Sequence, residues 1–291
     1  MKPVAFDYMA AESLDDAVSA LARAGGDGKI LAGGQSLVPM LNFRLVRPSI
    51  LIDINRVRDL GYVDATGDVV RVGALTRHHS LETSAVIRAH LPIVTAAVQH
   101  VAHLAIRNRG TIGGSLSHAD PAAELPMMAV LLDAKIGIRS QQGRRVADAR
   151  RFFTGSLTTE LKHDEMVTDV EFPRLLPNTG WAFEEMARRA GDFALAAVGV
   201  TMSAREGKAD RVRIGMMGVG ETPLRALEAE GLLAGKAIDA QALETAASAI
   251  EAAVEPNTDL HASADYRRFL VGALARRAIS VAWQRACGAL P

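Results

Sequence analysis

The sequence predicts an α+β protein built from two domains. The chain has 291 residues, of which 49% are hydrophobic, and its mean hydropathy of +0.11 is enough for a sizeable core. Helical and alternating patterns are mixed up to 173–180, a stretch with two prolines and a glycine. Beyond it, strands come first and helices later. We therefore place a domain boundary near residue 177, between regions 1–177 and 178–291.

The first region begins with a helix at 13–24. Ser13 is a suitable N-cap, aspartates follow in the first turn, and apolar residues recur at helical spacing. A short apolar run then predicts a strand at 29–32. The other predicted elements are a helix at 36–44, a strand at 50–54, a hairpin at 61–75, helices at 84–90, 92–104 and 121–132, and strands at 134–139, 145–149 and 165–172.

The second region starts with a predicted meander of three strands, at 181–188, 196–204 and 211–218. Three helices follow, at 223–234, 240–253 and 265–285. This order predicts a smaller α+β unit, in which a three-stranded sheet carries the helices.

Composition excludes several classes of function. Lysine plus arginine equals aspartate plus glutamate at 33 each, so no nucleic-acid partner is expected. No apolar run reaches the length of a membrane helix, and the N-terminus lacks an apolar signal core. We therefore expect no membrane span and a cytoplasmic location. The single cysteine, Cys287, excludes an internal disulfide, a zinc finger and an iron–sulfur cluster, but not a flavin or a nicotinamide.

Two short glycine motifs are the most informative features of the chain. They are Ala32-Gly33-Gly34-Gln35-Ser36 and Thr111-Ile112-Gly113-Gly114-Ser115. Each pairs two glycines with a hydroxyl residue, after apolar residues that can form a strand. Glycine lets the backbone approach a ligand closely, and consecutive N–H groups form an anion-binding concavity. We expect the two loops to hold the two phosphates of a dinucleotide.

Other nucleotide motifs do not fit. The dinucleotide fingerprint is G-x-G-x-x-G, whereas Gly215, Gly218 and Gly220 form G-x-x-G-x-G, the same spacings in reverse order. This favours a tight turn. Gly231 to Lys236 is one residue short of a P-loop and lacks the following hydroxyl, which favours a helix end.

Candidate nucleophiles and metal ligands are also weak. Ser36 and Ser115 lie outside G-x-S-x-G, so hydrogen bonding to phosphate is their expected role, and no catalytic residue is assigned. His78-His79 opens a predicted helix as a solvated cap. His100 and His103 could share a helix face, but they lack a third ligand at a recognisable spacing, so no metal site is predicted.

Three further positions carry alternatives that the residues leave open. His118 follows the second motif and could contact a ligand or make a local hydrogen bond. Asp120 and Glu124 could cap and complement a helix start, or accept hydrogen bonds from a ribose hydroxyl or a flavin ring. The run from Arg188 to Phe193 predicts a β-turn with a surface ion pair, or a site in which Phe193 covers a planar cofactor.

Together, these residues resemble the FAD-binding medium subunit of molybdenum hydroxylases, the carbon monoxide dehydrogenase and xanthine dehydrogenase group. The resemblance covers essentially the whole chain, and it rests on the order and spacing of short motifs. They are Phe6-Asp7-Tyr8, the 32–36 motif, Arg47-Pro48 before Leu51-Ile52-Asp53-Ile54, Ile106-Arg107, Gly110 to Ser115, Asp120-Pro121, Glu124-Leu125-Pro126, Gly191-Asp192-Phe193-Ala194 and Tyr266-Arg267.

The resemblance implies a fold. Residues 1–177 would form an FAD-binding domain of the vanillyl-alcohol-oxidase type, with subdomains at about 1–56 and 57–177. Residues 178–291 would form the smaller C-terminal flavoprotein domain, an α+β unit with a three-stranded sheet and helices. FAD would lie extended between the subdomains.

The resemblance also implies the cofactor contacts. The two glycine motifs would hold the pyrophosphate through backbone N–H groups and hydroxyls, and Phe193 would shield the isoalloxazine. At the positions of Gln35, Ser115 and Phe193, the resemblance implies histidine, asparagine and tyrosine in the carbon monoxide enzymes. These three differences favour a relative that hydroxylates organic, N-heteroaromatic rings. The implied contacts are Lys29, Ala32, Gly33, Gly34, Gln35, Ser36, Thr111, Ile112, Gly113, Gly114, Ser115, His118, Asp120, Glu124 and Phe193.

Partners are implied as well. A large subunit would carry the molybdenum cofactor, a small subunit two [2Fe–2S] clusters, and an external acceptor would take the electrons from a dimer of heterotrimers. Two alternatives remain open. One is a stand-alone flavin oxidoreductase of the same fold, which activity of this chain alone would support. The other is a nucleotide-binding regulatory protein, which a bound redox-active flavin would exclude.

Overall fold

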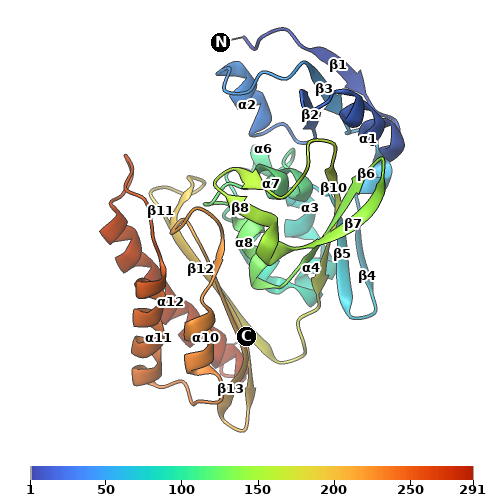
Figure 1. Ribbon diagram of the computed structural model, residues 1–291. Helices are drawn as coiled ribbons and strands as arrows, with labels where there is room; N and C mark the ends of the chain where they lie inside the picture. The colour runs from blue at the N-terminus through green and yellow to red at the C-terminus, as the bar shows by residue number, and fades with distance from the viewer. Residues whose placement is uncertain (1, 291) are drawn as a thin grey trace.

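The N-terminal part of the chain forms a small parallel sheet with strand order β1-β3-β2 (Figure 1). The computed structural model describes residues 2–290. Ser13 caps α1 as predicted: its hydroxyl accepts from the Asp16 N–H, and the Asp16 carboxylate accepts from the Ser13 N–H. The elements are β1 (Asp7–Ala10), α1 (Leu14–Arg23), β2 (Gly28–Leu31), α2 (Leu37–Asn42), β3 (Ile50–Asp53) and the 3₁₀ turn η1 (Arg58–Leu60).

Strand β1 has no counterpart among the predicted elements. Its first residues, Asp7 and Tyr8, are exposed, so the sequence carries no alternating pattern there. The strand forms because it pairs along the whole of β3, and because the Tyr8 hydroxyl donates to Asp53 Oδ2 at 2.7 Å. Tertiary pairing decides this element.

The middle of the chain forms a five-stranded antiparallel sheet, ordered β4-β5-β10-β6-β7, with helices packed on it. The predicted hairpin at 61–75 is confirmed, and Gly67 turns it at φ +57°. The elements are β4 (Val63–Thr66), β5 (Val69–Gly73), α3 (His78–Thr83), α4 (Ala85–His90), α5 (Pro92–Val98), α6 (Leu104–Arg107), α7 (Ile112–His118), α8 (Glu124–Leu131), β6 (Lys135–Ser140), β7 (Gly143–Asp148), α9 (Ala149–Phe152), β8 (Phe153–Gly155), β9 (Thr158–Thr159) and β10 (Met166–Pro173).

Three predicted elements of this part differ from the structure. The helix predicted at 92–104 ends at Val98, and it could not run on to 104, because Ala102 adopts φ +42°, outside the α-helical region. The second glycine motif is not a loop after a strand but the first turns of helix α7. The helix predicted at 121–132 begins only at Glu124.

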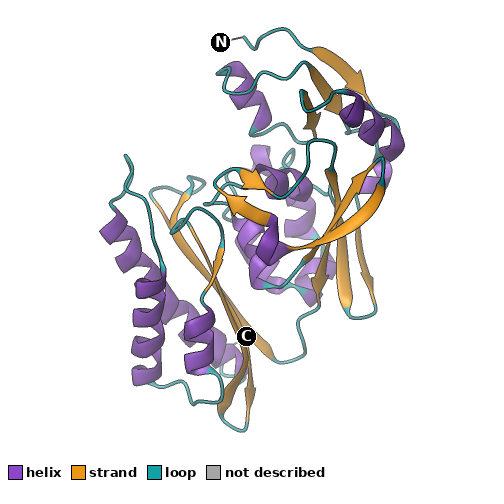
Figure 2. Cartoon of the chain, viewed as in Figure 1, coloured by secondary structure: helices purple, strands orange, loops and turns teal. Residues whose placement is uncertain are grey.

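The C-terminal part is an antiparallel sheet, ordered β11-β12-β13-β14, that carries helices on one face (Figure 2). The meander is confirmed and is extended by β14, a two-residue strand inside the helix predicted at 223–234. The elements are β11 (Thr179–Ala187), β12 (Ala194–Arg205), β13 (Lys208–Met217), β14 (Leu224–Arg225), α10 (Leu227–Leu233), α11 (Ala240–Ala253) and α12 (Ala264–Ala286). The division into 1–177 and 178–291 stays a prediction.

Helix α8 joins the middle sheet to the C-terminal sheet. Every residue from Leu125 to Leu131 is buried, as expected of a helix that is apolar all round. Where α8 meets the C-terminal sheet, Gly199 and Gly215 bring the backbones of β12 and β13 against Leu131. A Cβ at Gly199 would lie 2.9 Å from the Leu131 side chain, and a Cβ at Gly215 would lie 3.0 Å from it. Within residues 2–290, no helix has the length and apolar character needed to cross a bilayer.

Candidate cofactor site

The first glycine motif lines a cavity of about 440 Å³. Gly34 adopts φ +74°, a conformation that glycine reaches without strain. A Cβ at Gly33 would lie 2.9 Å from Gly110 Cα and closer still to the Arg109 carbonyl oxygen, so only glycine allows these segments to touch. The cavity is lined by Leu31, Ala32, Gly33, Gly34, Gln35, Val38, Pro39, Asp53, Asn55, Ile106 and Arg109.

This motif has the character of an anion cradle. Among residues 2–290, no acceptor pairs with the backbone N–H groups of 33–36. The Gln35 side chain donates to the Gly33 carbonyl at 3.0 Å and so braces the turn, while the Ser36 hydroxyl makes no capping hydrogen bond to α2. Consecutive N–H groups without acceptors are what a phosphate needs.

A polar network supports the cavity, and the sequence analysis missed it. Arg77 donates to the Arg109 carbonyl and, at 2.6 Å, to Asn55 Oδ1. Asn55 in turn donates to the Ala32 carbonyl at 2.8 Å and to Asp53 Oδ1 at 2.6 Å. Burial, with Arg109 nearby, lowers the pKa of Arg77, but an arginine stays protonated. The arginine at 109, two residues before the second motif, was the available signal.

The second glycine motif does not form the expected backbone cradle. The Ile112 and Gly113 N–H groups donate to the carbonyls of Thr76 at 3.1 Å and Ala74 at 2.9 Å. The Gly114 N–H donates to the Thr111 hydroxyl, which is the N-cap of α7. Gly113 is required for packing instead, since a Cβ there would lie 2.5 Å from Ala74 Cβ. The expectation of free N–H groups here is wrong, because the carbonyls of Thr76 and Ala74 and the Thr111 hydroxyl accept the first N–H groups of the helix.

Helix α7 leads from the cavity to the predicted acidic positions. His118 is its last residue and is half-buried, and Ala119 ends the helix in the left-handed conformation. Asp120 does not cap α8: its Oδ1 accepts the Ala122 N–H at 2.9 Å, and Ala123 is the N-cap. Burial raises the pKa of the Glu124 carboxyl to about 8, and the carboxylates of Glu185 and Asp120 add to the rise.

The turn that carries Phe193 packs against His103 and Ala102. Phe193 is 70% exposed, and Gly191 turns the chain at φ +85° against the His103 ring. The predicted surface ion pair forms between Arg188 and Asp192 at 3.6 Å.

Two other predicted positions lie outside the cavity wall. Lys29 is exposed on β2 and is not among the lining residues. His78 was expected to be a solvated cap, but it is buried under Gly110, and burial lowers its pKa to about 4. The structure thus unites the first motif with 106–110, and places the acidic residues at the far end of α7.

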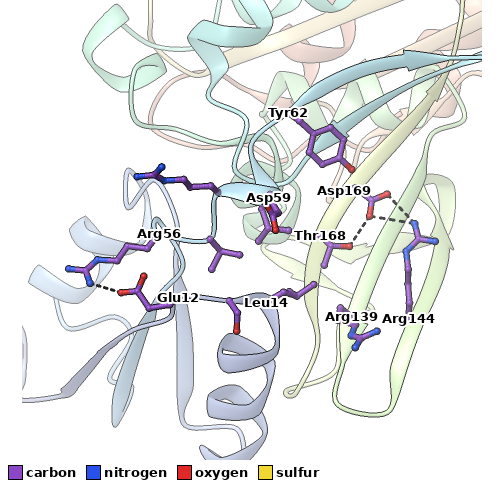
Figure 3. A pocket seen from close by; sticks show the side chains of 13 residues that line it. Glu12, Leu14, Arg56, Asp59, Tyr62, Arg139, Arg144, Thr168 and Asp169 are labelled. Carbon is purple, nitrogen blue, oxygen red and sulfur yellow. Dashed lines mark hydrogen bonds and ion pairs between the residues drawn. The ribbon is translucent and has the colours of Figure 1, made fainter.

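A second cavity, of about 510 Å³, lies between α1 and strands β6, β7 and β10 (Figure 3). Two ion pairs lie in its wall: Arg56 with Glu12 at 2.6 Å, and Arg144 with Asp169 at 3.1 Å. It is a polar seam between two parts of the fold.

Comparison with known proteins identifies the family. Residues 4–175 match the FAD binding domain in molybdopterin dehydrogenase, and residues 181–282 match the CO dehydrogenase flavoprotein C-terminal domain. The chain belongs to the FAD-binding medium subunits of molybdenum hydroxylases. It is 42% identical to the 6-hydroxypseudooxynicotine dehydrogenase complex subunit alpha of Paenarthrobacter nicotinovorans, over 98% of this chain and 97% of the relative.

Two solved structures share the fold of this medium subunit. Quinoline 2-oxidoreductase from Pseudomonas putida 86 superposes with a TM-score of 0.94 at 40% identity, over 98% of this chain and 99% of that one. Carbon monoxide dehydrogenase from Hydrogenophaga pseudoflava gives a TM-score of 0.96 at 38% identity, over 98% and 99%. The predicted family and fold class are confirmed, and the chain is an oxidoreductase subunit with an FAD-binding domain.

Proposed function

We propose that this chain is the FAD-carrying electron-transfer subunit of a heterotrimeric molybdenum hydroxylase. In that complex it receives electrons from [2Fe–2S] clusters and delivers them to an external acceptor, during hydroxylation of an organic substrate. The observation that carries the proposal is the first glycine motif. Its backbone N–H groups have no acceptor in residues 2–290 and lie in a chain that matches an FAD-binding domain over 4–175.

The residues present fit the cofactor. The N–H groups of 33–36 would hold the pyrophosphate, with the positive charge of Arg109 in the same cavity wall. Thr111 and Ser115 would contribute hydroxyls, and Asp120, Glu124 and Phe193 would lie at the flavin end. Bound FAD supplies the exchange between one-electron and two-electron redox chemistry.

We infer that Glu124 acts in this arrangement as a hydrogen-bond donor. With its pKa near 8, the carboxyl is largely protonated at neutral pH and offers an O–H donor. A neutral acid at this position adds no repulsion to electrons arriving at the cofactor. No side chain of this subunit is assigned as an acid or base toward the organic substrate.

The iron–sulfur clusters belong to a partner. Each [2Fe–2S] cluster takes four protein ligands, usually thiolates, and the chain has a single cysteine. We place two such clusters in a small subunit and the molybdenum cofactor in a large subunit, and we infer a dimer of these heterotrimers.

The proposed substrate is an N-heteroaromatic compound. Relatives named for 6-hydroxypseudooxynicotine and quinoline share 40–42% of residues with this chain, compared with 38% for the carbon monoxide dehydrogenase structure. The residues at Gln35, Ser115 and Phe193 favour the same class.

The first test is the visible spectrum of the purified chain, with mass identification of released cofactor. About one non-covalent FAD per chain supports the proposal. A chain that stays colourless and fails to bind added FAD, alone and with its co-expressed partners, overturns it. The purified complex is then assayed with quinoline, nicotine and carbon monoxide. Turnover of carbon monoxide alone would overturn the substrate class and leave the FAD assignment standing.

A further inference from the structure

Arg267 is a buried charge that the proposed FAD contacts do not use. It lies in the first turns of α12, with only 8% of its side chain exposed. Its Nη2 donates to Asp259 Oδ2 at 2.7 Å, and its Nη1 donates to two backbone carbonyls, Leu195 at 2.6 Å and Gly218 at 3.2 Å. A buried guanidinium is tolerated only when such partners compensate for its lost hydration.

The two carbonyls lie at the ends of neighbouring strands, at the start of β12 and just after β13. Leu195 is the second residue of β12 and follows the turn that presents Phe193. Gly218 directly follows β13 and adopts φ +75°. The two ends pack closely, since a Cβ at Gly218 would lie 3.0 Å from the Leu195 carbonyl oxygen. One guanidinium therefore fixes two neighbouring strand ends at once.

The second strand end reaches across to the FAD-binding region. The Gly218 N–H donates to the Pro121 carbonyl at 2.9 Å. Pro121 lies between Asp120 and Glu124, in the short segment that links α7 to α8. Arg267 is thus connected to the acidic segment through a single residue, Gly218, whose carbonyl it holds and whose N–H group holds Pro121.

The anchor of this arrangement is itself rigid. Asp259 Oδ1 accepts the N–H groups of His261 at 2.8 Å and Ala262 at 3.0 Å, which leaves Oδ2 for Arg267. These backbone bonds, with the guanidinium, lower the pKa of Asp259 to about 2, so its carboxylate is ionised near neutral pH. The direction of the Arg267 side chain is therefore set by the chain before α12.

We propose that Arg267 is a positioning residue for the flavin. It holds the Phe193 turn on one side and, through Gly218, the Asp120–Glu124 segment on the other. Loss of its donors would leave two carbonyls unpaired and would free both strand ends. The proposal deepens the FAD-carrying function and rests on it.

The test uses the full chain loaded with FAD and compares R267M, R267K and R268M. Arg268 is the matched control, because it lies next on the same helix, is more exposed and, within residues 2–290, pairs only with Asp265. For each protein we would measure the dissociation constant for FAD, the visible circular dichroism of the bound flavin, its midpoint potential, and the melting temperature without FAD.

We expect R267M to raise the dissociation constant for FAD about tenfold, equivalent to about 1.4 kcal/mol. We also expect it to change the flavin dichroism and potential. R267K keeps a charged donor and should recover part of each value, and R268M should match the wild type. If R267M lowers only the melting temperature, and all its flavin values equal those of the wild type, the positioning role is refuted.

A second variant covers the case in which R267M does not fold. D259N keeps the guanidinium but weakens its anchor, so its flavin dichroism should shift in the same direction as that of R267K. Wild-type flavin values in both D259N and R267K would overturn the proposal. A wild-type chain that binds no FAD overturns the proposed function itself, and the positioning role falls with it.

Discussion

Replacing Gly33 by alanine is the sharpest test of the first glycine motif. The added Cβ would lie 2.9 Å from Gly110 Cα, about 0.5 Å short of the 3.4 Å of ordinary contact, and closer still to the Arg109 carbonyl oxygen. Every atom that it meets belongs to backbone, so no side chain can rotate away. The motif and 109–110 must separate, which moves two walls of the cavity.

Overpacking of this kind costs about 1–3 kcal/mol. For a chain of this size, each 1 kcal/mol lowers the melting temperature by about 2–4 °C. If the displaced motif loses even about 1.4 kcal/mol of binding energy, the dissociation constant for FAD rises about tenfold. We expect both effects in G33A, measured by thermal unfolding and by fluorescence titration with FAD.

The matched control is G231A. Gly231 lies inside helix α10, and a Cβ there meets nothing within 4 Å. Alanine is favoured over glycine in a helix by about 0.5–1 kcal/mol, so this variant should be as stable as the wild type or slightly more stable. A G33A protein with wild-type melting temperature and FAD affinity would refute the steric reasoning and remove the support for a tight contact at 109–110.

Three further predictions address individual side chains. Protonated Glu124 contributes stability to the wild type that is fully present below about pH 4.5 and is lost as the pH rises through about 8. E124Q removes the titrating carboxyl and with it this pH dependence. Urea unfolding should therefore show the wild type losing stability relative to E124Q over that range, and parallel pH profiles would contradict it. The pKa of His78 is lowered, so its effect on stability has the opposite pH dependence. The stability that neutral His78 contributes is present above about pH 6.5 and is lost as the pH falls through about 4. In H78L the free energy of unfolding in guanidinium should therefore fall less steeply toward acid pH than in the wild type. An unchanged fall would count against a buried neutral imidazole. R77M leaves the Arg109 carbonyl and Asn55 without their donor, and should weaken FAD binding about tenfold by titration; unchanged affinity would show that the network does not shape the cavity.

Much of the fold could be predicted from local pattern. The N-cap at Ser13 and the hairpin that turns at Gly67 follow from the residues and appear in the structure at nearly the predicted positions, and the apolar helix α8 appears with a later start. Strand β1 could not be predicted this way, since its exposed Asp7 and Tyr8 show no alternation. Its order comes from a partner strand more than forty residues away.

The second glycine motif shows where pattern alone misleads. Two glycines beside hydroxyls have the composition of an anion loop, and the sequence cannot show where their N–H groups point. In the structure, Ala74 and Thr76 accept the first two N–H groups of α7, and Gly113 is small because Ala74 lies against it. The same residue type therefore serves ligand approach at Gly33 and helix packing at Gly113.

The sequence by itself determined the family and the fold class, because these depend on residue types and their spacing, and it predicted an anion-binding role for 32–36. Tertiary structure alone decided which segments meet. It placed Arg77, Asn55 and Arg109 around the first motif, and it connected Arg267 through Gly218 to the acidic segment. The physical reason is that hydrogen bonds to backbone carbonyls carry no signature in the sequence, since every residue presents the same acceptor.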